Sequence, residues 1–223
     1  TRLRFLPQAN GTPLVSLRAV ISNPLTGTDD LVAVLRDQRE IAAELEKIVI
    51  AYPDDIEAKA FLVVFLYQSK SSVPLTSQFA VDALISEIFQ KQPMHPAHHY
   101  RIHLWDHHKS EKALESAARC GQAAPRIAHM WHMPGHIYSK LNRFEDAVWH
   151  QQASARIDHA HMLERKLLPD QIHNSAHNNE WLARNWVHLG NAPDALAMAK
   201  GGVDVLFNLG ADLINPALDL ISI

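Results

Sequence analysis

The sequence predicts an all-α protein, a solenoid of helix–turn–helix repeats, and three observations support this class. Only 8 of the 223 residues are glycine, so the chain has few tight turns, which disfavours β-sandwiches and barrels. Apolar residues recur at helical spacing in segments of roughly 12–15 residues. No stretch shows the alternation of apolar and polar residues that is typical of a half-buried strand. Apolar residues make up 47% of the chain, which is enough for a sizeable core.

The order of the elements follows from helix start and stop signals. Residues 1–28 are predicted to be irregular because proline, glycine and asparagine interrupt them repeatedly. A helix is expected to start at 28–30, where a threonine and two aspartates precede the first apolar residue, and to stop at Pro53. Asp55 then opens the next helical segment, and Pro93 ends the one after it. From residue 29 onward we expect helices only.

Small residues recur where the second helix of each pair is expected to begin. The recurring residues are Ala42, Ala80, Ala113, Ala147 and Ala195. The last three intervals are 33, 34 and 48 residues, and 48 is 34 plus an insertion of 14. A helix–turn–helix unit of 34 residues is the period of the tetratricopeptide repeat. We therefore expect a repeat domain over residues 29–223, with the insertion near 156–172.

One unit carries the motif of that family clearly. Trp131, the Pro134-Gly135 pair, Tyr138 and Ala147 resemble the tetratricopeptide pattern W-x2-L-G-x2-Y followed by a small residue. The resemblance implies a right-handed superhelical solenoid. The unit departs from the pattern in two ways. Pro134 replaces a leucine and is expected to kink the helix or restart it, and Gln151 stands where the family has phenylalanine.

The chain contains fifteen histidines, and several of them lie a fixed number of residues before the last three of these alanines. The positions 18 residues earlier are His95, His129 and His177, and those 15 earlier are His98, His132 and Glu180. The positions 11 residues earlier are Ile102, His136 and Arg184. Such spacings place side chains on one helix face. The resemblance to tetratricopeptide repeats implies that this face lines a concave groove.

The pattern predicts a metal site, because imidazole is the commonest metal ligand in proteins and pairs three or four residues apart on a helix can share an ion. The candidate ligands are His95, His98, His99, His103, His129, His132, His136, His173, His177 and Glu180. Asp106, Asn178 and Arg184 are further candidate groove residues, and Asp106 is expected to orient His103. Zinc is the first choice of metal ion and copper the second.

Other functions stay open at this point. Without metal, the histidines would contact a protein, a peptide or a small ligand in the groove. With metal, the site could instead serve a hydrolase or an oxidoreductase. A purely structural spacer is disfavoured, because a spacer does not need histidines that recur on one face of its helices. The sequence contains no GxSxG, P-loop or HExxH motif, and its single cysteine, Cys120, is expected to be buried.

Two strings resemble a histidine-rich bacterial group of tetratricopeptide proteins. They are HPxxxYxIHxxD, at residues 95–106, and HxxHMPxHIY, at residues 129–138. The resemblance implies that His95, His103, Asp106, His132 and His136 are motif residues. It implies the fold and assigns no activity.

Charge and hydropathy exclude some partners. The formal net charge of −3 gives no reason to expect nucleic acid or an anionic membrane as a partner. No apolar run approaches the roughly 18 residues of a membrane span. The chain opens on Thr1, so we expect it to be part of a longer protein. A periplasmic or extracellular setting is slightly favoured.

Overall fold

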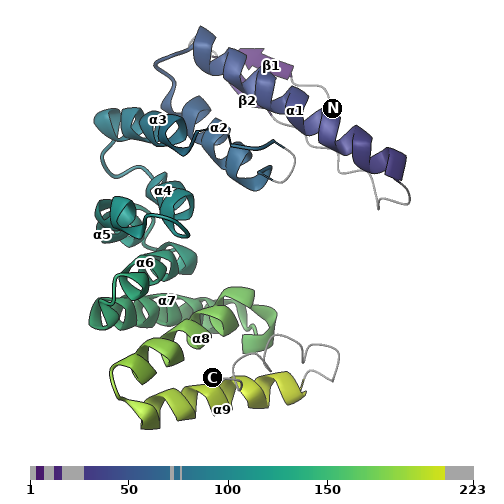
Figure 1. The fold of residues 1–223 in the computed structure, drawn as a ribbon. Coiled ribbons are helices and arrows are strands. Elements are labelled where there is room, and N and C mark those ends of the chain that lie inside the picture. The colour runs from purple at the N-terminus through teal and green to yellow at the C-terminus, as the bar shows by residue number, and fades with distance from the viewer. Residues whose placement is uncertain (1–3, 8–12, 17–27, 71–72, 76, 209–223) are drawn as a thin grey trace. The chain divides into compact units, whose positions relative to one another are not determined.

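The computed structural model describes residues 4–7, 13–16, 28–70, 73–75 and 77–208. The chain divides into two compact units, residues 1–93 and residues 94–223. Figure 1 labels the elements along the chain.

The first unit contains a short hairpin and three helices. They are β1 (Arg4–Pro7), β2 (Pro13–Ser16), α1 (Thr28–Ala51), α2 (Ile56–Gln68) and α3 (Gln78–Lys91). The two strands pair antiparallel, with Arg4 opposite Ser16. The segment 1–28, expected to be irregular, thus includes a hairpin, while the rest of it before residue 28 lies outside the described residues.

Helix α2 packs against both α1 and α3. Leu45, Ile48 and Leu62 form the core of this contact. Asp55 caps α2 as the sequence predicts, because its carboxylate accepts hydrogen bonds from the backbone N–H groups at positions 57 and 58. Ala42 is buried while Ala80 is exposed, so the repeat is less regular here than further along the chain.

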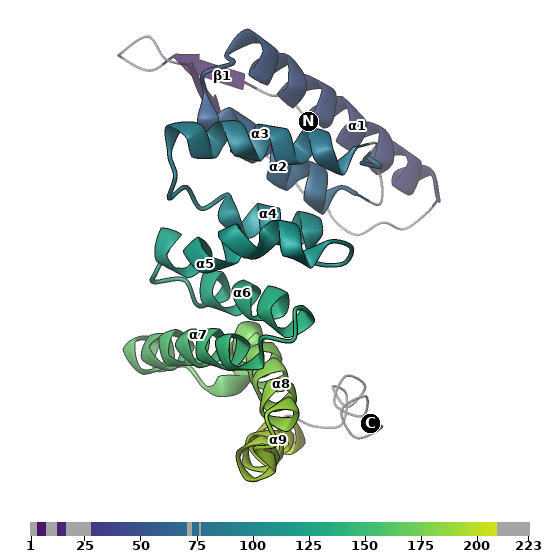
Figure 2. The ribbon, with the colours of Figure 1, turned by 60° about the vertical axis from the view of Figure 1, so that its left-hand side comes forward.

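The described residues of the second unit, 94–208, form three helix pairs in sequence. The elements are α4 (His98–Trp105), η1 (Ser110–Ala113), α5 (Leu114–Ala123), α6 (Ala128–Lys140), α7 (Phe144–Arg165), η2 (Pro169–Gln171), α8 (His173–His188) and α9 (Ala192–Asn208). Each α-helix packs against the next, and the first helices of successive pairs also contact one another, α4 with α6 and α6 with α8. Figures 1 and 2 show these helices following each other in chain order. The contact pattern is that of a helical repeat array.

The small residues predicted to open the second helices take up that place in this unit. Ala113, Ala147 and Ala195 lie at the start of η1–α5, α7 and α9, and all three are buried. Ile102 and Ile137, on the first helices, are fully buried. The 34-residue period therefore corresponds to one helix pair.

The two irregular features of the sequence have simple structural outcomes. The segment 156–172, predicted to be an insertion, contains the last part of α7, which ends at Arg165, and the single turn of η2. Helix α6 runs from Ala128 to Lys140 with Pro134 inside it, so the helix does not restart at the proline. All histidines of α6 thus lie on one continuous helix.

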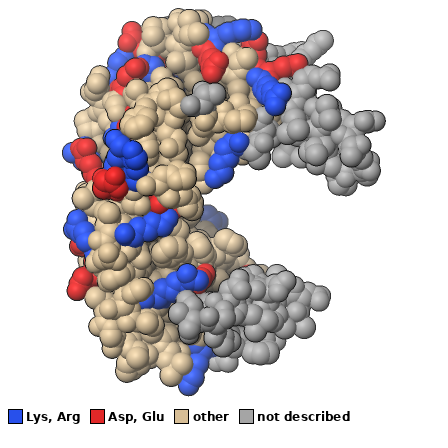
Figure 3. Space-filling view, in the orientation of Figure 1, with Lys and Arg blue, Asp and Glu red and all other residues tan. Residues whose placement is uncertain are grey.

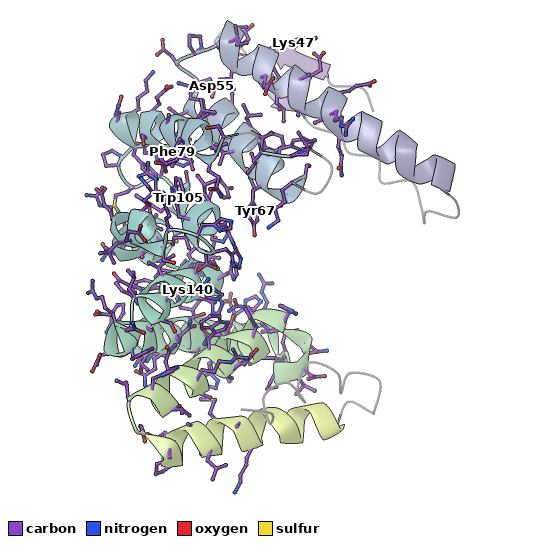
Figure 4. The ribbon with its side chains drawn as sticks, in the orientation of Figure 1. Lys47, Asp55, Tyr67, Phe79, Trp105 and Lys140 are labelled. Atoms are coloured by element: carbon purple, nitrogen blue, oxygen red, sulfur yellow. The ribbon has the colours of Figure 1, made fainter. Side chains whose placement is uncertain are left out.

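The described surface carries both signs of charge. In the face shown in Figure 3, blue and red side chains are interspersed rather than gathered into one region. None of the described helices combines the length and the apolar character that crossing a bilayer requires. Figure 4 shows the described side chains along the helices, among them Trp105 of α4 and Lys140 of α6.

A buried aromatic group lies on the outer helix of the middle pair. The ring of His150 on α7 stacks on Tyr138, with centroids 5.1 Å apart, and contacts Trp149 edge to face at 4.8 Å. Its Nδ1 atom is buried and has no hydrogen-bond partner among the described residues. Burial lowers the pKa of His150 to about 4, although the Asp146 carboxylate opposes the shift.

We expect His150 to make the stability of the fold depend on pH. Its pKa is lower in the folded state than the ordinary 6.5, so the unfolded state binds more protons and stability falls as pH drops from 6.5 toward 4. The loss at pH 5 is about 1–2 kcal/mol for this residue. Urea titrations of metal-free protein between pH 7.5 and pH 5 should show a shallower pH dependence in His150→Phe. An unchanged dependence in that variant would contradict this assignment.

Candidate metal centre

Seven histidines on the first helices of the second unit form a continuous row of rings. This histidine row comprises His99 and His103 on α4, His129, His132 and His136 on α6, and His173 and His177 on α8. Along it, ring centroids of neighbouring members lie between 4.5 and 6.2 Å apart. The row brings together the first helices of three successive helix pairs.

Among the described residues, two groups of three histidines in the row have nitrogen atoms close enough to hold a metal ion. The His132 site consists of His132, His136 and His177, and the His99 site of His99, His103 and His129. Within each site, one nitrogen from every ring lies within 4.8 Å of the others. Each site connects two first helices, α6 with α8 and α4 with α6.

The orientation of His132 is fixed by two buried amides. Its Nδ1 atom lies 2.8 Å from Gln151 Oε1 and 3.0 Å from Asn178 Oδ1. The Asn178 amide nitrogen donates to the Gln151 carbonyl at 2.9 Å, and the Gln151 amide nitrogen donates to the His132 carbonyl at 3.4 Å. Both amide oxygens therefore face the ring, so Nδ1 carries the proton. The lone pair is then on Nε2, which lies 2.8 Å from His136 Nε2.

Carboxylates stand behind the other two rings of the His132 site. His136 Nδ1 lies 3.4 Å from Asp106 Oδ2, and His177 Nδ1 lies 3.6 Å from Glu180 Oε2. A carboxylate behind a ligating histidine sets the tautomer and raises the basicity of the other nitrogen. In all three rings of this site, Nδ1 faces an oxygen atom, and Nε2 is the nitrogen on the opposite side of the ring. In the metal-free structure the Nε2 atoms of His132 and His136 share a hydrogen bond, and a metal ion would take the place of its proton.

The His99 site has the same arrangement in part. His99 Nε2 and His103 Nε2 are 3.1 Å apart. His129 Nδ1 lies 3.0 Å from Asn174 Oδ1, and the Asn174 amide nitrogen donates to Asp158 Oδ2 at 2.6 Å. The donation fixes the amide, so His129 also carries its proton on Nδ1. Asp158 lies on α7, within the segment predicted to be an insertion.

His99 and His132 are neutral near pH 7, the state in which imidazole binds metal. Burial, together with neighbouring imidazoles, lowers the pKa of His99 and of His132 to about 3, and lowers that of His177 as well. Burial would raise the pKa of Asp106, but hydrogen bonds from His136 and Lys140 outweigh it and hold the pKa at about 2. Asp106 is therefore an anion that stands behind the His136 ring.

Other sequence candidates lie outside the two sites. His95 precedes α4 and accepts a hydrogen bond from the Ala97 N–H at Nδ1. His98 is 1% exposed, and its Nδ1 lies 3.0 Å from Ser116 Oγ. On α4 the row is thus formed by residues one position later than the repeat offsets predict, since His99 and His103 face it while His98 and Ile102 are buried.

The remaining candidates surround the His132 site or extend the row. Asp106, expected to orient His103, contacts His136. Asn178 holds His132, and Arg184 pairs with Glu180. Glu180 stands behind His177, and exposed His173 follows it at 6.2 Å between centroids. Cys120 is buried, as expected, and burial raises the pKa of its thiol.

Three residues of the centre were not predicted from the sequence. Gln151 and Asp158 support the two sites, and the indole of Trp181 stacks on His136 with centroids 4.0 Å apart. Gln151 carried a signal, because it replaces the phenylalanine of the family pattern. Gly135 is needed for the same arrangement, since a Cβ atom there would overlap the Gln151 side chain.

Comparison with known proteins shows the fold. No family model and no curated protein sequence matches the chain. Three solved structures of MamA are similar, at 11–14% identity and TM-scores of 0.57–0.61. The structure of MamA from Desulfovibrio magneticus RS-1, "MamA 41-end", has 13% identity and a TM-score of 0.61, covering 84% of this chain and 100% of that chain.

Two more of the similar structures agree with this match. "Crystal structure of MamA protein" has 11% identity and a TM-score of 0.59, covering 78% of this chain and 86% of that chain. "MamA MSR-1 C2" has 14% identity and a TM-score of 0.57, covering 82% and 95%. MamA has the tetratricopeptide fold, so the predicted all-α repeat fold is confirmed. Identity this low shows the fold alone.

Replacing Gly135 tests the support of His132 by Gln151. An alanine in place of a mid-helix glycine ordinarily stabilises a helix by about 0.5–1 kcal/mol. We expect Gly135→Ala to lower the free energy of unfolding instead, by about 1–3 kcal/mol, because the new methyl group displaces Gln151. Ser139→Ala, on the same helix, is the control and should change stability little. A stabilised Gly135→Ala protein would show that Gln151 is not held in this position.

Proposed function

We propose that this repeat protein binds a transition-metal ion at the His132 site. The observation that carries the proposal is the shared orientation of the three rings, whose Nδ1 atoms all face oxygen atoms. Two of those oxygen atoms belong to carboxylates, and the others to buried amides. Such support behind each ligand is characteristic of metal sites.

The ligand set suits a tetrahedral ion with one open position. Three histidine nitrogens at about 2.0–2.1 Å are the ligands of one class of zinc site, in which water or another ligand takes the fourth place. Two nitrogens on such an ion are about 3.3 Å apart, and the Nε2 atoms of His132 and His136 are 2.8 Å apart. Binding therefore needs only a small opening between these two rings.

Zinc remains the first choice and copper the second. Copper(I) favours thioether and thiolate ligands, whereas imidazole suits zinc and several other divalent ions. The methionines next to the histidines of α6, Met130 and Met133, are buried in the core, and Cys120 is buried on α5. The donor atoms of the site are thus nitrogen atoms alone.

The fold suggests how such an ion would be used. Tetratricopeptide-like arrays present the side chains of successive repeats along one extended surface, and the ion would add a strong anchor for a protein, a peptide or a small ligand. The open position also supports the second candidate, a metal-dependent hydrolase or oxidoreductase, in which the ion would act on bound water or dioxygen.

Elemental analysis tests the metal site. Tag-free protein, stripped with chelator and incubated with zinc, should retain the ion after desalting. The double variant His132→Ala/His136→Ala should lose the ion bound at this site because it lacks two of three ligands. His108→Ala, which removes an exposed histidine outside the row, should bind as the unaltered protein does. Circular dichroism would establish that the variants fold.

The outcome against the proposal is equally clear. If the unaltered protein takes up neither zinc nor copper, metal binding at this site is wrong. The row would then act by hydrogen bonding to a metal-free ligand. Equal retention by the folded double variant and the unaltered protein would place the metal elsewhere in the chain.

The amide that accepts the hydrogen bond from His132 should affect the affinity of the His132 site for zinc. Gln151→Met keeps nearly the same side-chain length but removes the oxygen that accepts from Nδ1. We expect the dissociation constant for zinc to rise about 10–100-fold, the usual effect of losing such a partner. Gln152→Met, at the next position on α7, is the matched control. Competition titrations with a chromophoric chelator would measure both variants, and an unchanged constant in Gln151→Met would count against the role of this amide.

A further inference from the structure

We propose that the His99 site holds a second metal ion beside the first, and that the two ions form one centre that binds an oxyanion across both. This inference rests on the proposed function, because it adds an ion and a ligand to a site already taken to hold one. It concerns residues on α4, α6 and α8 only, all within the second unit.

The first step is the common direction of two rings. On α6, His129 and His132 are three residues apart, and on α8, Asn174 and Asn178 are four apart. Each asparagine oxygen lies 3.0 Å from the Nδ1 atom of one of these histidines. Because both Nδ1 atoms face amides of the same helix, both Nε2 atoms lie on the side of the ring opposite those amides.

The second step is the distance between the ions. The rings of His129 and His132 are stacked, with planes 21° apart and centroids separated by 5.5 Å. An ion bound at Nε2 lies in the plane of its ring, so two such ions are separated by about the ring spacing, roughly 5 Å. This is somewhat wider than the two-metal centres with ions about 3.5–4 Å apart. A phosphate or carboxylate group can reach both ions with two of its oxygens.

The third step is charge. Two divalent ions bring four positive charges, and the six imidazoles that would hold them are neutral ligands. Two of the nearby carboxylates are already paired with cations, Asp106 with Lys140 at 2.8 Å and Glu180 with Arg184, and the third, Asp158, accepts a hydrogen bond from the Asn174 amide. Three protein ligands per ion leave an open position on each. The pair of ions therefore favours an anionic ligand with at least two oxygen atoms.

The two sites can be removed one at a time. His103 belongs to the His99 site alone, and His177 belongs to the His132 site alone. We expect unaltered protein to bind two equivalents of zinc, and His103→Ala and His177→Ala to bind one each. His108→Ala again serves as the control and should bind two.

Cobalt reports whether the ions share one centre. In protein loaded with two equivalents of Co²⁺, the spin–spin interaction of ions about 5 Å apart should broaden or quench the electron paramagnetic resonance signal. One equivalent in either single-site variant should give the signal of an isolated ion. Inorganic phosphate should then change the visible spectrum of the doubly loaded protein at a concentration at least tenfold lower than in either variant.

The possible results test the second ion, the common centre and the bridging oxyanion separately from the first metal ion. One equivalent of zinc, lost in His177→Ala and kept in His103→Ala, would overturn the second ion and leave the first. Two equivalents with uncoupled cobalt spins would overturn the common centre. Coupled spins with equal phosphate responses in all three proteins would overturn the bridging oxyanion. No bound metal in any protein would overturn both proposals.

Discussion

The candidate centre depends on one constraint, the hydrogen bonds that hold Nδ1 of His132 against the oxygens of Gln151 and Asn178. A buried imidazole with a fixed tautomer can present its lone pair in only one direction. That direction is toward His136, whose own Nδ1 faces Asp106. The orientation of the whole His132 site follows from these oxygen contacts, which come from three helices and could not form in an isolated repeat.

The repeat architecture explains how these contacts arise. Equivalent positions on successive first helices are adjacent in space, so histidines separated by one period become neighbours. The second helix of the middle pair, α7, lies behind α6 and α8 and supplies Gln151 and Asp158. Gly135 lets the Gln151 side chain reach its place. Gln151, which departs from the tetratricopeptide pattern, is therefore a residue that adapts a structural repeat to a polar interior.

The sequence predicted the helical repeat that carries the candidate centre better than it predicted the individual contacts within the centre. The 34-residue period and the buried Ala113 and Ala147 followed from spacing, because small residues are required where helices approach closely. The spacing did not predict which residues of α4 face the histidine row. Successive side chains on a helix point about 100° apart, so the residues that face the row depend on where the helix begins, here at His98. The support by Asp158 could not be predicted either, because it depends on how far α7 extends.

The most direct test of this account is the tautomer of His132, measured by side-chain ¹H–¹⁵N correlation spectra of metal-free protein at neutral pH. The account predicts that His132 carries its proton on Nδ1, and that addition of zinc shifts the Nε2 resonances of His132, His136 and His177. A proton on Nε2 of His132, with no change in these resonances when zinc is added, would contradict it.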